Sequence, residues 1–174
     1  MLATPLTAQD IQDWLYRGTP TKPASHLPHR IRVLWANLAS LDQRLHSAPE
    51  PTPTTPEQIT RRRCETDAIW EGRISALRWL IEFIRVKPST WPDSCSAEDF
   101  ADYAPFPSGS DAAYLADLWT SCTKATSHST HNSGHTPLDN AAFDRGRELI
   151  CAHLNATIYK NTGTSVEEEA LLPT

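Results

Sequence analysis

The sequence predicts an all-α fold, a single-domain bundle of about five main helices. Apolar residues recur at steps of three and four over several long stretches, which is the spacing that gives a helix one apolar face. β-branched residues alternate with polar ones for only a few positions at a time, so no strand is expected. A chain of 174 residues also falls within the usual size range of one domain, which we place at residues 1–163.

The first part of the chain predicts two helices joined by a linker. The first helix is expected over about residues 8–17, where the apolar residues follow helical spacing. A linker with three prolines at 18–28 separates it from a second helix over about residues 29–47. The second helix has one continuous apolar seam, which consists of Ile31, Leu34, Leu38, Leu41 and Leu45.

A proline-rich connector at 48–56 leads into a long third helix. Spaced prolines favour an extended polyproline-II strand, and Thr55 and Pro56 then form a helix start, so we expect a helix over 56–86. Its second half alone has an apolar seam, which consists of Trp70, Ile74, Leu77, Ile81 and Ile84. Because the two seams have the same length, the second and third helices should pair antiparallel, which leaves residues 48–68 as an overhang.

The second half of the chain predicts three further helical segments. A short helix is expected near residues 97–103, capped by Ser96, and a longer one over 111–124. Serine and threonine then become frequent, which predicts a flexible loop at 126–136.

The last predicted helix covers residues 136–159 and starts at a Thr-Pro pair like the one before the third helix. A glycine inside a helix costs about 1 kcal/mol relative to alanine, so it usually has a packing reason. We therefore expect Gly72 and Gly146, which lie inside two predicted helices, to mark close helix crossings. Residues 164–174 are expected to be an acidic, disordered tail.

The charge of the chain is uneven. Its formal net charge is −5, with net +3 in residues 1–63 and net −8 in residues 64–174. This balance argues against unspecific coating of nucleic acid, but it can orient the protein on a charged partner. The longest apolar runs are four or five residues, and residues 1–5 lack the features of an export signal. We therefore expect a cytoplasmic protein with no membrane association.

No constellation of residues points to catalysis. The sequence contains no GxSxG, P-loop, GxGxxG or HExxH motif, and its six glycines are too few for the usual phosphate loops. Cys151 and His153 cannot share a site, because helical residues two apart point about 200° away from each other. We therefore expect a protein that is not an enzyme and needs no cofactor.

One set of potential metal ligands stands out, with the spacing C-x5-H-x2-H-x3-H. Zinc accepts thiolate and imidazole ligands, so Cys122, His128, His131 and His135 could form a closed zinc site. The classical pairing of two ligands on a tight turn is missing, which favours solvated loop histidines instead. All four cysteines, which are Cys64, Cys95, Cys122 and Cys151, are expected to be reduced, and most of them to pack as small apolar residues.

Five arginines are candidates for binding phosphate or an acidic partner, because the guanidinium group donates two parallel hydrogen bonds to an anion. They are Arg30 and Arg32 at the start of the second helix and Arg61, Arg62 and Arg63 on the overhang. Together they could form a basic strip along a nucleic-acid backbone. The alternative is a solvated face, because acidic residues lie four positions from Arg61 and Arg63 and suit intrahelical ion pairs.

Two tryptophans are candidates for contact with a protein partner. Trp79 lies off the apolar seam of the third helix, so either a second layer of helices covers it or it belongs to a partner surface. Trp91 is expected in a loop, and tryptophan is enriched at the centres of binding interfaces.

These observations favour a non-catalytic small helical subunit or adaptor that acts by docking to other macromolecules, a protein partner above all. The first alternative is a subunit of a larger nucleoprotein complex that contacts nucleic acid through the basic overhang. The second alternative is a metal-binding protein that uses the Cys122 cluster.

Overall fold

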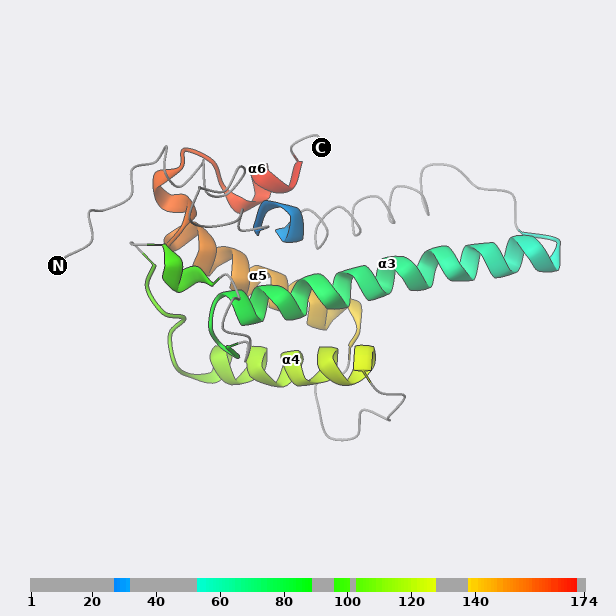
Figure 1. Cartoon of the computed structure of the whole chain (residues 1–174), viewed down its shortest axis with the longest axis horizontal. Helices are drawn as coiled ribbons and strands as arrows, with labels where there is room; N and C mark the ends of the chain where they lie inside the picture. The colour runs from blue at the N-terminus through cyan, green and yellow to red at the C-terminus, as the bar shows by residue number, and fades with distance from the viewer. Residues whose placement is uncertain (1–26, 32–52, 89–95, 101–102, 128–137, 172–174) are drawn as a thin grey trace.

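The computed structural model describes residues 27–31, 53–88, 96–100, 103–127 and 138–171 (Figure 1). Within these ranges every regular element is a helix, and the helices pack as a single bundle, which confirms the predicted all-α class. No helix in the described ranges is long and apolar enough to cross a membrane.

The longest helix is α3, which covers Pro56–Phe83. It starts where the sequence predicts, because Thr55 and Gln58 cap each other: the Thr55 hydroxyl accepts from the Gln58 amide at 3.3 Å, and the Gln58 side chain accepts from the Thr55 amide at 3.2 Å. Its 28 residues correspond to a length of about 42 Å. The helix ends slightly earlier than expected, and the chain turns at Arg85, whose φ of 65° lies in the left-handed region.

Two further helices pack against the C-terminal half of α3 (Figure 1). They are α4, which covers Ser110–Ser127, and α5, which covers Asn140–Ala156. We expected the last helix to start at 136, but Asp139 is its N-cap, because the Asp139 carboxylate accepts from the Ala142 amide at 2.8 Å. α5 also ends before residue 159, and a 3-10 turn, η2 (Tyr159–Asn161), follows it.

Two short segments differ from their predictions. Within the described residues 96–100, the helix expected near 97–103 is one 3-10 turn, η1 (Ala97–Asp99), with Ser96 as its N-cap as expected; the Ser96 amide donates to the Asp99 carboxylate at 3.0 Å. The segment expected to be a disordered tail contains a helix, α6 (Val166–Leu171), whose first residue is fully buried. Its order has a local cause, since the Val166 amide donates to the Asn155 side chain at 2.8 Å and the Ser165 amide donates to Glu168 at 2.8 Å.

The core lies between the C-terminal half of α3 and the helices α4 and α5. The predicted seam of α3 is confirmed, with Trp70 half-buried and Ile74, Leu77, Ile81 and Ile84 at most 3% exposed. Other helices contribute fully or almost fully buried side chains, among them Leu115, Leu118, Phe143, Ile150 and Leu154. Burial of this apolar surface is the main favourable contribution to folding.

The predicted pairing of the second and third helices is visible only at one end. Residues 27–31 are helical, and Leu27 and Ile31 are fully buried in the core. The Arg30 guanidinium lies 5.8 Å from the ring centre of Trp79, toward the end of α3, where an antiparallel partner would begin. The rest of the second helix lies outside the described residues.

Several other predicted segments also lie outside the described residues. They are the first helix, the proline-rich connector up to residue 52, and the predicted loop from residue 128 onward. The start of that loop, at 126, differs from the prediction, because α4 continues to Ser127.

Gly146 marks a close helix crossing, as the sequence predicts. A methyl group at this position would lie 2.7 Å from Leu118 Cδ2 and 3.3 Å from Leu77 Cδ1, so the glycine lets α5 approach both α3 and α4. Both leucines are fully buried, which leaves them little room to move. For Gly72, close approach stays a prediction.

We predict that Gly146→Ala destabilises the protein by about 1 kcal/mol. Overpacking a well-filled core costs about 1–3 kcal/mol, which exceeds the gain of up to about 1 kcal/mol from the higher helix propensity of alanine. Urea unfolding of both proteins measures the difference. As a check on the cause, Leu118→Val should cost less in the Gly146→Ala background than in the wild type, and equal costs would contradict the steric explanation.

Candidate functional site

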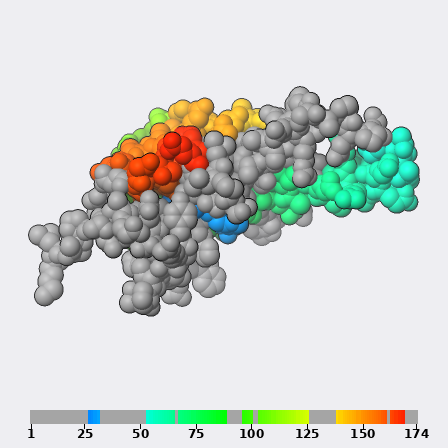
Figure 2. Space-filling model, turned by 90° about the horizontal axis from the view of Figure 1, so that it is seen from above, coloured from blue at the N-terminus to red at the C-terminus, as the bar shows by residue number. Residues whose placement is uncertain are grey.

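The N-terminal half of α3 contributes nothing to the core. Of residues 56–69, which we call the α3 arm, no side chain that the structure describes is buried, and full burial begins at Arg73. The arm projects beyond α4 and α5 in Figure 1, and Figure 2 shows its N-terminal end at the tip of the molecule, far from α6.

The three consecutive arginines of the arm have different surroundings. Arg61 Nε lies 2.9 Å from Glu65 Oε1, and the two side chains are 83% and 54% exposed. Such a surface ion pair contributes about 0–1 kcal/mol to stability. For Arg61 the interpretation as a solvated, ion-paired face is therefore confirmed.

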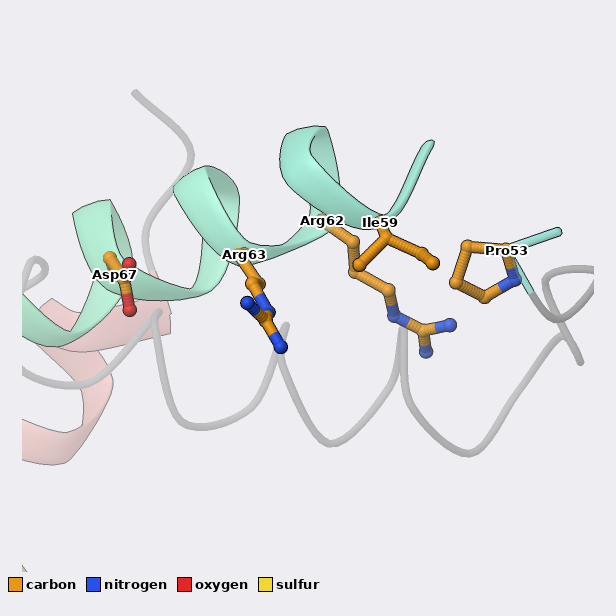
Figure 3. A pocket seen from close by; sticks show the side chains of 5 residues that line it. All are labelled: Pro53, Ile59, Arg62, Arg63 and Asp67. Atoms are coloured by element: carbon orange, nitrogen blue, oxygen red, sulfur yellow. The ribbon is translucent and has the colours of Figure 1, made fainter. Parts of the chain in front are cut away.

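The other two arginines line a pocket on the arm (Figure 3). Ile59, Arg62, Arg63 and Asp67 are spaced by three and four residues, which places them on one face of the helix, and Pro53 lies just before it. The labelled side chains point to the same side of α3. Arg63 and Asp67 have the spacing of an ion pair, but no ion pair joins these two described residues.

The pocket also contains exposed apolar surface. Ile59 is 40% exposed and is the large apolar side chain that stands out as exposed in the described ranges. Pro53 is half-buried beside it. The site therefore offers an apolar end, two guanidinium groups and one carboxylate in a row along the helix.

The structure places the arginines of the predicted basic strip in two separate groups, and their binding to one partner stays a prediction. Arg30 lies over Trp79, and on α3 that position is about 25 Å along the helix from Arg62. The two groups of arginines therefore lie at opposite halves of α3. Arg32 lies outside the described residues.

Trp79 is a packing residue at the edge of the core. Its ring stacks on Phe83 with ring centres 5.0 Å apart and planes at 17°, and the Arg30 side chain covers it. It is half-buried, so one part of the ring stays open to contact from outside. Trp91, the other predicted anchor, lies outside the described residues.

Two polar clusters that the sequence analysis missed fasten α3 to its neighbours. Glu82 Oε1 accepts from Arg78 Nε at 3.0 Å and from the Trp119 indole N–H of α4 at 2.8 Å. Arg73, only 4% exposed, donates to the Asn140 side chain at 3.3 Å, and its guanidinium lies against the rings of Trp70 and Phe143. The spacing of four residues could have predicted the Arg78–Glu82 pair. Contacts of α3 with side chains on other helices leave no pattern in the local sequence.

The described residues contain no group of three or more histidine, cysteine or acidic side chains that could hold a metal ion. Cys122 is fully buried, and burial raises the pKa of its thiol to about 12, so the thiol is protonated at neutral pH. The three loop histidines of the suggested zinc cluster lie outside the described residues. That hypothesis stays a prediction.

Two titratable rings, those of Tyr103 and His153, meet away from the arm, where residues 103–106 pack against α5. The Tyr103 hydroxyl donates to the Ile84 carbonyl oxygen and lies 3.3 Å from His153 Nε2. Burial raises the pKa of Tyr103 to about 12 and lowers the pKa of His153 below its usual value. Tyr103 and Phe106 enclose the His153 ring, so this cluster connects a loop to α5 and is part of the packing.

Comparison with known proteins adds no family. No protein-family model matches the chain, and no curated protein or solved structure shows significant similarity to it. The function is therefore argued from the residues alone.

We predict that the native protein exposes one reactive thiol when Cys95 is replaced by serine. Cys64 lies exposed on the α3 arm, whereas Cys122 and Cys151 are buried and burial raises the pKa of both thiols. A thiol-reactive dye should label one cysteine of Cys95→Ser rapidly and three after denaturation. Rapid labelling of more than one thiol in the folded state would contradict the packing described above.

We predict that the protein loses stability as the pH falls below about 6.5. Because the pKa of His153 is lower in the folded state, the unfolded chain binds a proton first as the pH falls. The contribution of His153 to stability is therefore fully present above the pKa of the unfolded state and is lost as the pH falls toward the pKa of the folded state. The slope due to this residue is at most about 1.4 kcal/mol per pH unit. Urea unfolding between pH 7.5 and pH 5 measures it.

The matched controls for this pH dependence are His153→Gln and His29→Gln. The first should flatten the decline, because glutamine does not titrate. The second should leave it unchanged, because His29 is exposed. An identical decline in all three proteins would show that another group is responsible.

Proposed function

We propose that this protein is a non-catalytic docking subunit whose α3 arm binds an acidic partner. The observation that supports the proposal is the division of α3 into a half that builds the core and a half in which no described side chain is fully buried. The N-terminal half of α3 has no role in the packing of the described residues. Its helix start is nevertheless fixed by a capping box, and its first turns carry three arginines.

The physical chemistry of the arm suits a contact with an anionic macromolecule. Exposed guanidinium groups are weakly hydrated and bind carboxylates or phosphates with two hydrogen bonds, so they are enriched at interfaces. An isolated helical stretch of this length is only marginally stable in water, and a bound partner would stabilise it. Residues 70–174 have a net charge of −6, whereas the arm has three arginines and three acidic residues, so an acidic partner would be repelled less by the arm than by the bundle.

Protein and nucleic acid remain two classes of partner for this surface. A protein partner is favoured because the arm combines its arginines with the exposed Ile59 and with acidic residues. A phosphate backbone would gain nothing from Ile59 and would be repelled by the acidic residues.

The test is an affinity purification of the tagged full chain from cells that produce it naturally, with and without nuclease treatment. We expect partner proteins that survive nuclease and that fall at least about tenfold when Arg61, Arg62 and Arg63 are all changed to glutamine. The matched control changes Lys87, Lys124 and Lys160 to glutamine, which removes the same charge from the bundle and should retain the partners.

The outcomes separate the hypotheses. Partners lost after nuclease treatment would support the nucleoprotein alternative. Equal loss in the arginine variant and in the lysine control would mean that only net charge matters, and retention of all partners by the arginine variant would refute a role for the arm.

A further inference from the structure

We propose that residues 163–171 form a C-terminal strap, which opens about Gly163 while the rest of the bundle stays folded and which shields Cys151 when it is closed. The strap includes α6, and it is independent of the docking function proposed for the arm. Figure 1 shows α6 along the outer side of α5, on the side away from α4.

Few contacts among the described residues hold the strap to the bundle. Val166 is the one side chain of the strap that the structure describes as fully buried. The Asn155 side chain adds two hydrogen bonds, because its Oδ1 accepts from the Val166 amide at 2.8 Å and its Nδ2 donates to Glu167 Oε2 at 2.9 Å. The capping box between Ser165 and Glu168 lies within the strap itself, so it shapes α6 without attaching it to α5.

The helix α6 depends on these contacts for its own order. It has six residues, whereas isolated helices shorter than about 12–15 residues are only marginally stable in water. Loss of the contacts at Val166 and Asn155 should therefore release the whole strap. The close approach of α3, α4 and α5 at Gly146 involves no residue of the strap, so the rest of the bundle can stay folded when the strap opens.

Gly163 has the conformation that a hinge of this strap requires. Its φ of 73° lies in the left-handed region, and a Cβ atom added to it would meet nothing within 4 Å. The closed state spans this residue with a hydrogen bond, in which Thr162 Oγ1 accepts from the Thr164 amide at 3.3 Å. Gly163 therefore supports the closed state through its backbone conformation alone.

Three observations place Cys151 under the strap. Cys151 lies four residues before Asn155, so both side chains are on the same face of α5. Cys151 is 4% exposed, and the Glu167 carboxylate contributes, after burial itself, to the raised pKa of its thiol. Opening of the strap should therefore expose this thiol to water, whereas Cys122 lies fully buried on α4 and should stay covered.

The experiment uses the full chain with the replacements Cys64→Ser and Cys95→Ser. It measures how fast a thiol-reactive dye labels the two remaining thiols, Cys122 and Cys151. At dye concentrations where the rate is proportional to the dye, each rate reports the population in which that thiol is exposed. We expect Cys151 to react at least about tenfold faster than Cys122, with little dependence on urea below the unfolding transition, because local opening exposes little surface.

Two glycine variants separate opening of the strap from unfolding of the bundle. Gly163→Ala should raise the labelling rate of Cys151 about fivefold or more, because alanine disfavours the left-handed conformation of the closed strap. Gly109→Ala is the matched control, since Gly109 also has a positive φ, of 148°, and open space around its Cβ position, but lies outside the strap. It destabilises the bundle equally with the strap closed or open, so it should raise the rate of Cys122 and leave that of Cys151 unchanged.

A third variant, Asn155→Ala, tests the attachment itself and should raise the rate of Cys151 about tenfold through the loss of two hydrogen bonds. Equal rates of Cys151 and Cys122 in every variant would overturn the proposal, because both thiols would then be exposed only when the whole bundle unfolds. Equal effects of Gly109→Ala and Gly163→Ala on Cys151 would also overturn it. So would labelling of Cys151 as fast as that of an exposed thiol, because the strap would then not be closed in the native protein.

Discussion

The bundle depends on the close approach of α5 to α3 and α4 at Gly146. A methyl group at this position would lie too close to Leu77 and Leu118 unless these side chains shift. This contact brings Phe143, one turn before Gly146, against Trp70 with ring centres 4.9 Å apart. The core therefore starts at Trp70, and the part of α3 before that residue is left outside it.

Polar contacts keep this packing in one register. The Glu82 carboxylate accepts from Arg78 on its own helix and from Trp119 on α4. The buried Arg73 guanidinium lies against aromatic rings and donates to Asn140 at the start of α5. Charged groups inside a core are costly unless they are well paired, and in return they favour one arrangement of the helices over slipped ones. Position along α3 is thus fixed by polar groups as well as by apolar ones.

The same division of α3 underlies the proposed function. Its C-terminal half packs on α4 and α5, and its N-terminal half extends beyond them (Figure 1). A pocket on a regular helix holds its side chains at fixed spacing, which reduces the entropy lost on binding. The docking surface proposed for the arm therefore follows from the way the core is built.

The sequence by itself determined the helical class, the start of α3, the apolar seam of α3 and the close approach at Gly146, because these depend on local spacing and capping. Only the tertiary structure decided that Arg30 lies far from Arg62, that Asp139 starts α5, and that α6 packs through Val166 onto Asn155. It also showed that Arg61 pairs with Glu65, whereas Arg62 and Arg63 line a pocket. The positions of Arg30 and Val166 depend on which segments pack together, and spacing within one helix does not specify that. The Asp139 cap and the Arg61–Glu65 pair are local contacts, but the sequence left their choice among neighbouring partners open.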